Sequence, residues 1–105
     1  MAGEYLRALI SATSKDEAER ILRTLLEKKL VSGGFIFGGD SRHWWKGKID
    51  EEPYYNISAF AVERNKDKII KTVEELSKDE VPLVLFFKID YGNKSFLEWI
   101  EKNSG

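Results

Sequence analysis

The spacing of apolar residues changes several times along this chain, and each change predicts where an element begins or ends. Residues 6–12 carry an almost wholly apolar face and predict a strand. Ser14 followed by Glu17 is a capping-box signature, which predicts that a helix begins there. The apolar residues after it recur at steps of three and four and predict one buried helix stripe, made of Ala18, Ile21, Leu22, Leu25, Leu26 and Leu30.

The middle of the chain predicts a long β-hairpin. Residues 32–37 are β-prone, the pattern is interrupted at Gly38 and Gly39, and it resumes up to a turn at Lys46-Gly47. The return strand is expected over residues 48–62. Pro53 lies within it and indicates an edge or a bulge, because proline has no N–H to donate to a neighbouring strand.

The length of this hairpin predicts an oligomer. A continuous strand over residues 32–45 would span roughly 45 Å at about 3.3 Å per residue. A compact chain of this size has a radius of gyration of only about 13 Å. The hairpin must therefore bend at Gly38-Gly39 or project beyond its own core, and a projecting arm with two tryptophans near its tip needs a partner to cover it.

The rest of the chain completes a single domain over residues 1–105. Asn65 is expected to cap a second helix, whose buried stripe is Ile69, Ile70, Val73 and Leu76. Residues 81–89 are expected to form a strand. Asn93 is expected to cap a short last helix that carries Phe96, Leu97 and Ile100. The order β-α-β-β-α-β-α predicts an α+β fold, a ferredoxin-like sandwich with helices on one face of an antiparallel sheet. An extra C-terminal helix and a long hairpin between the second and third strands complete this expectation.

Composition narrows the classes of function. The 105 residues carry 17 basic and 18 acidic side chains, and the net charge of −1 gives no basic footprint for nucleic acid. The chain has no cysteine, which excludes disulfides and thiolate metal sites. The first residues lack a signal-peptide pattern, and no segment approaches the roughly 20 apolar residues of a membrane span. We therefore expect a cytoplasmic protein without nucleic-acid or membrane partners.

Residues 41–49 concentrate the side chains that could bind a ligand. Trp44 and Trp45 are candidates for subunit contacts or for the wall of a small-ligand cleft, and Lys48 is a candidate partner for an anionic group. Successive side chains of a strand point to opposite faces, so at most one of the two tryptophans is expected to face a given cleft.

The only histidine, His43, is the centre of a candidate metal site with Asp50 and Glu52. Imidazole and carboxylate ligands suit a divalent cation such as copper or zinc. Carboxylates on such an arm are also typical of a solvated face. Ser41 shares a strand face with His43 and would be a nucleophile beside a base. No third orienting group is evident, however, and no nucleophile or phosphate-binding motif occurs, so the chain is predicted not to be an enzyme.

Several fragments together resemble the CutA family, the proteins named for divalent-cation tolerance. The stretch 25–31, the Trp45-Lys46-Gly47-Lys48-Ile49 hairpin and the Val81-Pro82 pair occur in the family's order and spacing, without gaps from residue 25 to residue 84. The resemblance implies a ferredoxin-like subunit, a compact homotrimer whose hairpins pair strand to strand, and a role in the response to metal ions.

The chain departs from the family at most of the polar positions of its cleft. Gly33 replaces a candidate metal-binding cysteine, and His43 replaces a tyrosine. Tyr54 and Leu83 each stand where the family frequently has a glutamate. The segment Ser77-Lys78-Asp79 stands in place of a His-Pro-Tyr motif. The resemblance therefore implies a trimeric binding or interaction protein with an altered site. The alternatives are a small-metabolite regulatory trimer resembling nitrogen-signalling proteins, a cation binder that uses His43 and the acidic hairpin, and a hydrolase that uses Ser41 and His43.

Overall fold

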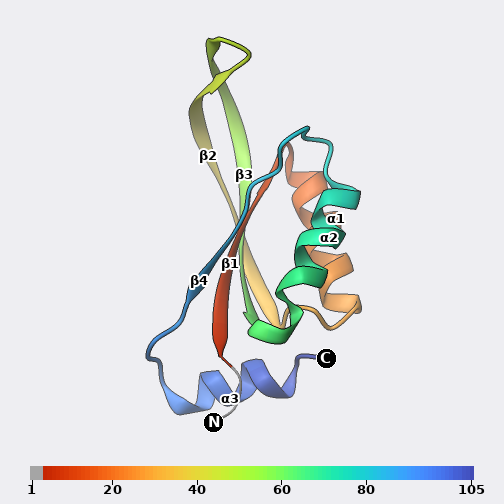
Figure 1. Ribbon diagram of the computed structural model, residues 1–105, viewed down its shortest axis with the longest axis vertical. Helices are drawn as coiled ribbons and strands as arrows, with labels where there is room; N and C mark the ends of the chain where they lie inside the picture. Colours follow the sequence, from red (N-terminus) through yellow and green to blue (C-terminus); the bar gives the residue numbers. More distant parts are fainter. Residues whose placement is uncertain (1–3) are drawn as a thin grey trace.

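The computed structural model describes residues 4–105 and shows one antiparallel sheet with two helices on one face (Figure 1). The sheet has the strand order β2-β3-β1-β4. Its elements in chain order are β1 (Tyr5–Ala12), α1 (Lys15–Glu27), β2 (Gly33–Trp45), β3 (Lys48–Val62), the short 3-10 helix η1 (Glu63–Asn65), α2 (Lys66–Leu76), β4 (Val84–Lys88) and α3 (Lys94–Lys102). The predicted ferredoxin-like α+β fold, its C-terminal helix and its long hairpin are confirmed.

The core lies between the sheet and the helices α1 and α2. Small and branched residues of the central strands, among them Ala8, Ile10 and Ala59, face Ile21 and Leu25 of α1 and are fully buried. The predicted α1 stripe is confirmed at its centre, whereas Leu26 at its margin remains 39% exposed. Burial of these side chains supplies most of the driving force for folding, at about 25 cal/mol per Å² of apolar surface.

The hairpin formed by β2 and β3 projects from the sheet as an arm (Figure 1). The two strands pair without interruption from Gly33↔Phe60 to Trp45↔Lys48, whereas the pairing of β3 with β1 ends at Tyr55. The longest dimension of the molecule is 46 Å. Of the two predicted possibilities, a bend at Gly38-Gly39 or a projection beyond the core, the structure shows the projection, and the ladder continues through both glycines.

Two details of the arm follow from local backbone chemistry. Pro53 pairs one to one with Asp40 and lies beyond the last residue paired with β1, so the predicted edge is confirmed and the bulge is wrong. Lys46 and Gly47 both have positive φ, 49° and 82°, as the two central residues of a type I′ hairpin turn require.

The predicted Ser14 cap is confirmed, whereas the Asn65 and Asn93 caps and one strand boundary differ from the prediction. Ser14 does accept a hydrogen bond from the N–H of Glu17 (3.1 Å), but Asn65 makes no capping bond and its amide donates to the Gly105 carbonyl (3.4 Å). Asn93 likewise occupies the N-cap position of α3 without a capping bond. The last strand begins at Val84 instead of residue 81, because Pro82 has no N–H for the ladder.

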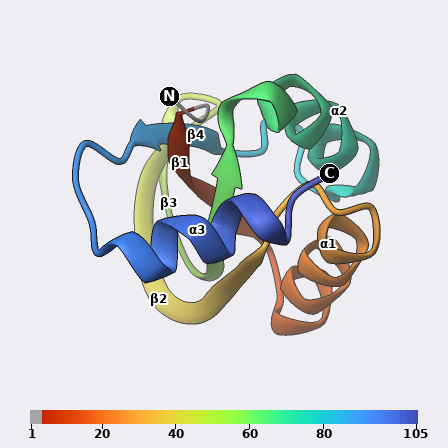
Figure 2. The same cartoon turned by 90° about the horizontal axis from the view of Figure 1, so that it is seen from below.

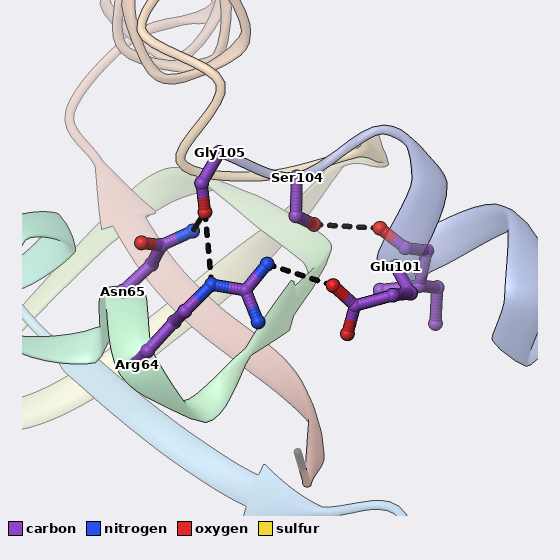
Figure 3. A network of polar contacts seen from close by, with 6 residues as sticks. Arg64, Asn65, Glu101, Ser104 and Gly105 are labelled. Atoms are coloured by element: carbon purple, nitrogen blue, oxygen red, sulfur yellow. Dashed lines mark hydrogen bonds and ion pairs between the residues drawn. The ribbon is translucent and has the colours of Figure 1, made fainter. Parts of the chain in front are cut away.

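Helix α3 crosses the end of the sheet far from the arm tip (Figure 1) and stays outside the layer of α1 and α2 (Figure 2). Phe96 packs edge-on against Phe60 of β3, with ring centroids 5.1 Å apart. Arg64 donates to Glu101 (2.8 Å) and to the Gly105 carbonyl (3.0 Å), as Figure 3 shows. These contacts attach α3 to the sheet and to the start of α2. None of the helices within residues 4–105 is long and apolar enough to span a membrane.

Candidate functional site

A cleft of about 810 Å³ lies along the arm, and most of the predicted site residues line it. Its walls come from the arm, from the end of β1 and from the connection between α2 and β4. The lining residues that bear on its chemistry are Ser41, His43, Trp44, Trp45, Asp50, Glu52, Tyr54, Lys78, Asp79 and Glu80. Segments far apart in the chain therefore meet at one polar cavity.

The three predicted metal ligands lie together in this cleft. One side-chain ligand atom from each of His43, Asp50 and Glu52 lies within 4.8 Å of the others. The register of the hairpin is the cause, since His43 pairs with Asp50 and Ser41 pairs with Glu52. Directly opposed residues of an antiparallel pair share a face, so all of these side chains point to the same side of the arm.

The imidazole of His43 is held on two sides. Its Nδ1 lies 2.8 Å from the Ser41 hydroxyl oxygen, and the Tyr54 ring packs edge-on against it, with centroids 5.7 Å apart. When Nδ1 carries the proton and donates to Ser41, the lone pair of Nε2 points toward the carboxylates. Histidines that ligate metals are usually oriented by such a bond through their other nitrogen.

The same contacts give little support to a nucleophilic serine. The Ser41 hydroxyl is engaged with Nδ1, and the carboxylate nearest to Nε2, that of Asp50, lies 3.9 Å away. This distance is too long for the hydrogen bond that would orient a catalytic base. A carboxylate that could orient the base, that of Asp50, is thus present in the cleft, but it lies too far from His43 to complete a catalytic triad.

The carboxylates of the cleft perturb each other and their neighbours. A hydrogen bond with Asp50 raises the pKa of Glu52, because sharing a proton between two carboxylates favours the protonated form. The Tyr54 hydroxyl donates to Asp79 (2.9 Å), and burial together with this bond raises the pKa of Tyr54 to about 12. The carboxylates therefore give the cleft a negative electrostatic potential, which favours positively charged groups.

Both predicted tryptophans are among the residues that line the cleft. Trp45 belongs to the alternating set of His43, whereas Trp44 belongs to the opposite set. The expectation that at most one of them faces the cleft stays a prediction. Trp44 is 73% exposed, whereas Trp45 is partly covered.

Lys48 lies opposite Trp45 in the hairpin but is not among the residues that line the cleft. Lys78 lines the cleft, and a second lysine near it is Lys46, which the sequence pattern predicts only as a turn residue. Its ammonium lies 5.6 Å from the Trp45 ring centroid and 3.5 Å from a Glu80 carboxylate oxygen. Both groups are largely exposed, so this ion pair is worth less than about 1 kcal/mol.

Sequence reasoning missed the roles of Tyr54 and Asp79. They are 25 positions apart in the chain and belong to different elements, and they meet only in the folded protein. No spacing or motif marks such a pair. In the sequence, Tyr54 is only a departure from the family pattern, and Asp79 lies only where a family motif is absent.

Gly33, which replaces the candidate cysteine of the family pattern, is not among the cleft-lining residues. It lies at the other end of β2, beneath α3. A Cβ atom added to it would lie 2.9 Å from the Trp99 ring, closer than real Cβ atoms approach a neighbour. Helix α3 therefore uses the space that a side chain at position 33 would fill.

The fold and the cleft together define a class of protein: a small ferredoxin-like domain with a projecting arm that carries an acidic, histidine-containing cavity. The family model described as CutA1 divalent ion tolerance protein matches residues 6–103, and the chain belongs to this family. The predicted family is thereby confirmed.

Relatives and solved structures agree with this assignment. The divalent-cation tolerance protein CutA of Archaeoglobus fulgidus is 35% identical over 96 residues, which cover 89% of this chain and 91% of that protein. A solved structure described as the periplasmic divalent cation tolerance protein CutA from the same organism has a TM-score of 0.92 at 31% identity, covering 94% and 97% of the two chains. The divalent cation tolerance protein of Thermus thermophilus matches with a TM-score of 0.92 at 25% identity, covering 96% and 99%.

Proposed function

We propose that this protein binds a divalent cation, copper or zinc, through His43, Asp50 and Glu52. The observation that carries the proposal is the convergence of one imidazole and two carboxylates within 4.8 Å on one face of the arm. First-row cations bind these ligand atoms at about 2.0–2.2 Å, so a small rotation of the side chains would bring them to bonding distance. The Ser41 contact with Nδ1 supports this role, since it leaves Nε2 free for the ion.

The charge of the cleft favours a cation over an anionic metabolite. Leaving out the residues of the arm that face its other side, the lining includes four carboxylates, those of Asp50, Glu52, Asp79 and Glu80, against the basic side chain of Lys78. A phosphate group would meet this excess negative charge without a preorganised cradle. The small-metabolite alternative therefore has less support, and calorimetry with a nucleoside triphosphate should show no heat of binding.

Calorimetric titration with zinc and with copper tests the proposal. We expect one site per chain, and an affinity that falls at least about tenfold in His43→Ala, because a metal site loses one of its ligands. Glu52→Gln should weaken binding as well. Glu51→Gln is a matched control, since Glu51 is the adjacent carboxylate, faces the other side of the arm and pairs with Arg42 (3.5 Å). Equal weakening by both glutamine variants would show general charge attraction and would contradict a specific site.

We further propose that the chain assembles with copies of itself, as a homotrimer. The face of the sheet opposite α1 and α2 exposes Phe35, Phe37, Leu85 and Phe87 at 43–67% of their surface. Apolar area of this extent is unusual on a monomer and typical of an interface. Light scattering should give a mass of three times the 12.1 kDa chain, and a monomer at micromolar concentration would contradict the proposal.

The role we propose is binding rather than catalysis, because the Ser41, His43 and Asp50 geometry does not complete a nucleophile with its base. Assay of the parent with a generic ester should show no turnover that His43→Ala abolishes. We propose the cytoplasm as its location, which the absence of cysteine suits. Fractionation of the source cells tests this point.

A further inference from the structure

We propose that Tyr54 and Asp79 are positioning residues that hold the His43 imidazole in the orientation needed to bind the cation. Together with Glu17 and Lys78 they form a chain of contacts, called here the Tyr54 brace, that runs from the start of α1 to His43. The inference rests on the proposed function for its ligand. The orientation itself is measurable in the protein without metal.

The first link of the brace fixes the connection between α2 and β4. Glu17 is only 1% exposed, and its carboxylate accepts hydrogen bonds from the N–H and hydroxyl of Thr13 (2.6 and 2.9 Å) and from the N–H of Lys78. A buried carboxylate persists only when it is fully hydrogen-bonded. Glu17 thereby attaches the segment that carries Asp79 to the N-terminus of α1.

The second link joins this segment to the arm. Asp79 accepts a hydrogen bond from the Tyr54 hydroxyl at Oδ2 (2.9 Å), and its own N–H donates to the Ser77 hydroxyl oxygen (3.1 Å). The acceptor of the Tyr54 hydroxyl is thus itself held in place. Tyr54 lies one residue beyond the end of the pairing between β1 and β3, where the arm has only two strands. The bond therefore joins the body of the protein to the arm at the point where the arm leaves the three-stranded part of the sheet.

The third link orients the imidazole. The Tyr54 and His43 rings lie at 86° with centroids 5.7 Å apart, an edge-to-face packing geometry. Ser41 contacts Nδ1 from another side. A half-turn of the ring about the Cβ–Cγ bond would exchange Nδ1 with Cδ2 and Nε2 with Cε1, which would break the contact with Ser41 and turn Nε2 away from Asp50 and Glu52. Fixing the Tyr54 ring limits that rotation.

Tyr54→Phe tests the inference, because it removes the hydroxyl and keeps the ring. Asp79→Ala removes the other half of the same bond. Tyr55→Phe is the matched control, since Tyr55 is the adjacent tyrosine, faces the opposite side of β3 and packs against the core. His43 is the only histidine, so nitrogen-15 NMR of the imidazole reports its tautomer without assignment ambiguity.

In the metal-free protein we expect the single tautomer of the parent and of Tyr55→Phe to give way to a mixture in Tyr54→Phe and Asp79→Ala. With zinc, we expect both variants to bind about tenfold more weakly, at the lower end of the effects seen for residues that orient metal ligands. The double variant should bind no more weakly than either single one, because both remove the same bond. Thermal melting of each variant confirms that it is folded.

The outcomes separate the two proposals. If Tyr54→Phe keeps the parent's tautomer and zinc affinity while His43→Ala loses binding, the brace has no positioning role and the cation site stands. If the parent does not bind zinc or copper, the proposed function fails, and the tautomer measurement still decides whether the brace orients His43. An equal effect in Tyr55→Phe would indicate a general loosening of the arm and would contradict the inference.

Discussion

At the scale of single residues, Tyr54 shows how a side chain acquires properties that its residue type alone does not have. Its ring contacts His43 and its hydroxyl donates to Asp79, which places a phenol between an imidazole and a group of carboxylates. Ionising this phenol would add a negative charge next to existing ones and would break the bond to Asp79. Burial and this bond raise its pKa from 10.0 to about 12.

This shift predicts a loss of stability in strong base. Because the folded pKa is raised, the contribution of Tyr54 to stability is fully present below the unfolded value of 10.0 and is lost as the pH rises toward 12. The difference between the ultraviolet phenolate titrations of the parent and of Tyr54→Phe should isolate one group with a pKa of about 12. A difference curve centred at 10 would contradict the environment described for Tyr54.

A second prediction at this scale concerns Gly33. A Cβ added there meets the Trp99 ring at 2.9 Å, whereas a Cβ added to Gly39 meets nothing within 4 Å. Gly33→Ala should therefore displace Trp99 and lower the free energy of unfolding by about 1–3 kcal/mol, as overpacking typically does. Gly39→Ala should change it by less than about 0.5 kcal/mol, as expected for an exposed site. Denaturant unfolding of both variants measures the difference, and equal stabilities would show that α3 is not packed on Gly33.

At the scale of elements, the start of α1 is held by a buried charge. Burial alone would raise the pKa of Glu17, but the hydrogen bonds donated by Thr13 and Lys78 outweigh burial and leave the pKa below its ordinary value of 4.5. One carboxylate thus joins the helix N-terminus to the connection between α2 and β4, which are distant in the chain.

The sign of this shift predicts how stability depends on pH. Because the folded pKa is lowered, the contribution of Glu17 is fully present above pH 4.5 and is lost as the pH falls through the folded value. Glu17→Gln should cost about 1.5–3 kcal/mol at neutral pH, the range for hydrogen bonds to a charged group. Denaturant unfolding between pH 7 and pH 3 should show this cost shrinking as the parent is acidified. A cost independent of pH would contradict the role of the charge.

The elements differ in how well the sequence predicted them, and the cause is the range of the interactions. The α1 stripe and the hairpin follow from side-chain periods within one segment. The Asn65 cap failed because its amide bonds to Gly105, 40 residues away in the chain. The last strand was predicted too long because apolar character continues through Val81 and Leu83, where Pro82 removes a ladder donor.

For the candidate site, too, the range of the interactions decides what the sequence predicts. Counting outward from the two-residue turn at Lys46-Gly47 pairs residue 43 with 50 and residue 41 with 52, so the convergence of His43, Asp50 and Glu52 is readable from hairpin register. Asp79 reaches the site only through the connection between α2 and β4, whose path depends on Glu17. The position of Asp79 depends on tertiary packing, so no local sequence pattern predicts it.

At the scale of the whole molecule, the cleft and the exposed apolar face are continuous. Phe35, Phe37 and Leu85 point away from α1 and α2, and so do His43, Asp50 and Tyr54, because all occupy positions of the same alternating set in the paired strands. The proposed metal ligands therefore lie at the arm end of the face that we propose to be the subunit interface. An assembly that covers this face would also restrict access to the cleft.

The last prediction tests that assembly directly. Phe35 is 67% exposed and Leu85 is 50% exposed, on outer strands of the same face, so a carboxylate at either position would be buried unpaired in a self-interface. Phe35→Glu and Leu85→Glu should each dissociate the assembly at micromolar concentration, since losing a central interface anchor costs about 2–4 kcal/mol. Leu26→Glu, an exposed apolar residue of α1 on the other side of the molecule, is the control and should leave the mass unchanged. Sedimentation velocity separates these cases, and dissociation in the Leu26 variant alone would place the interface on the helices instead of the sheet.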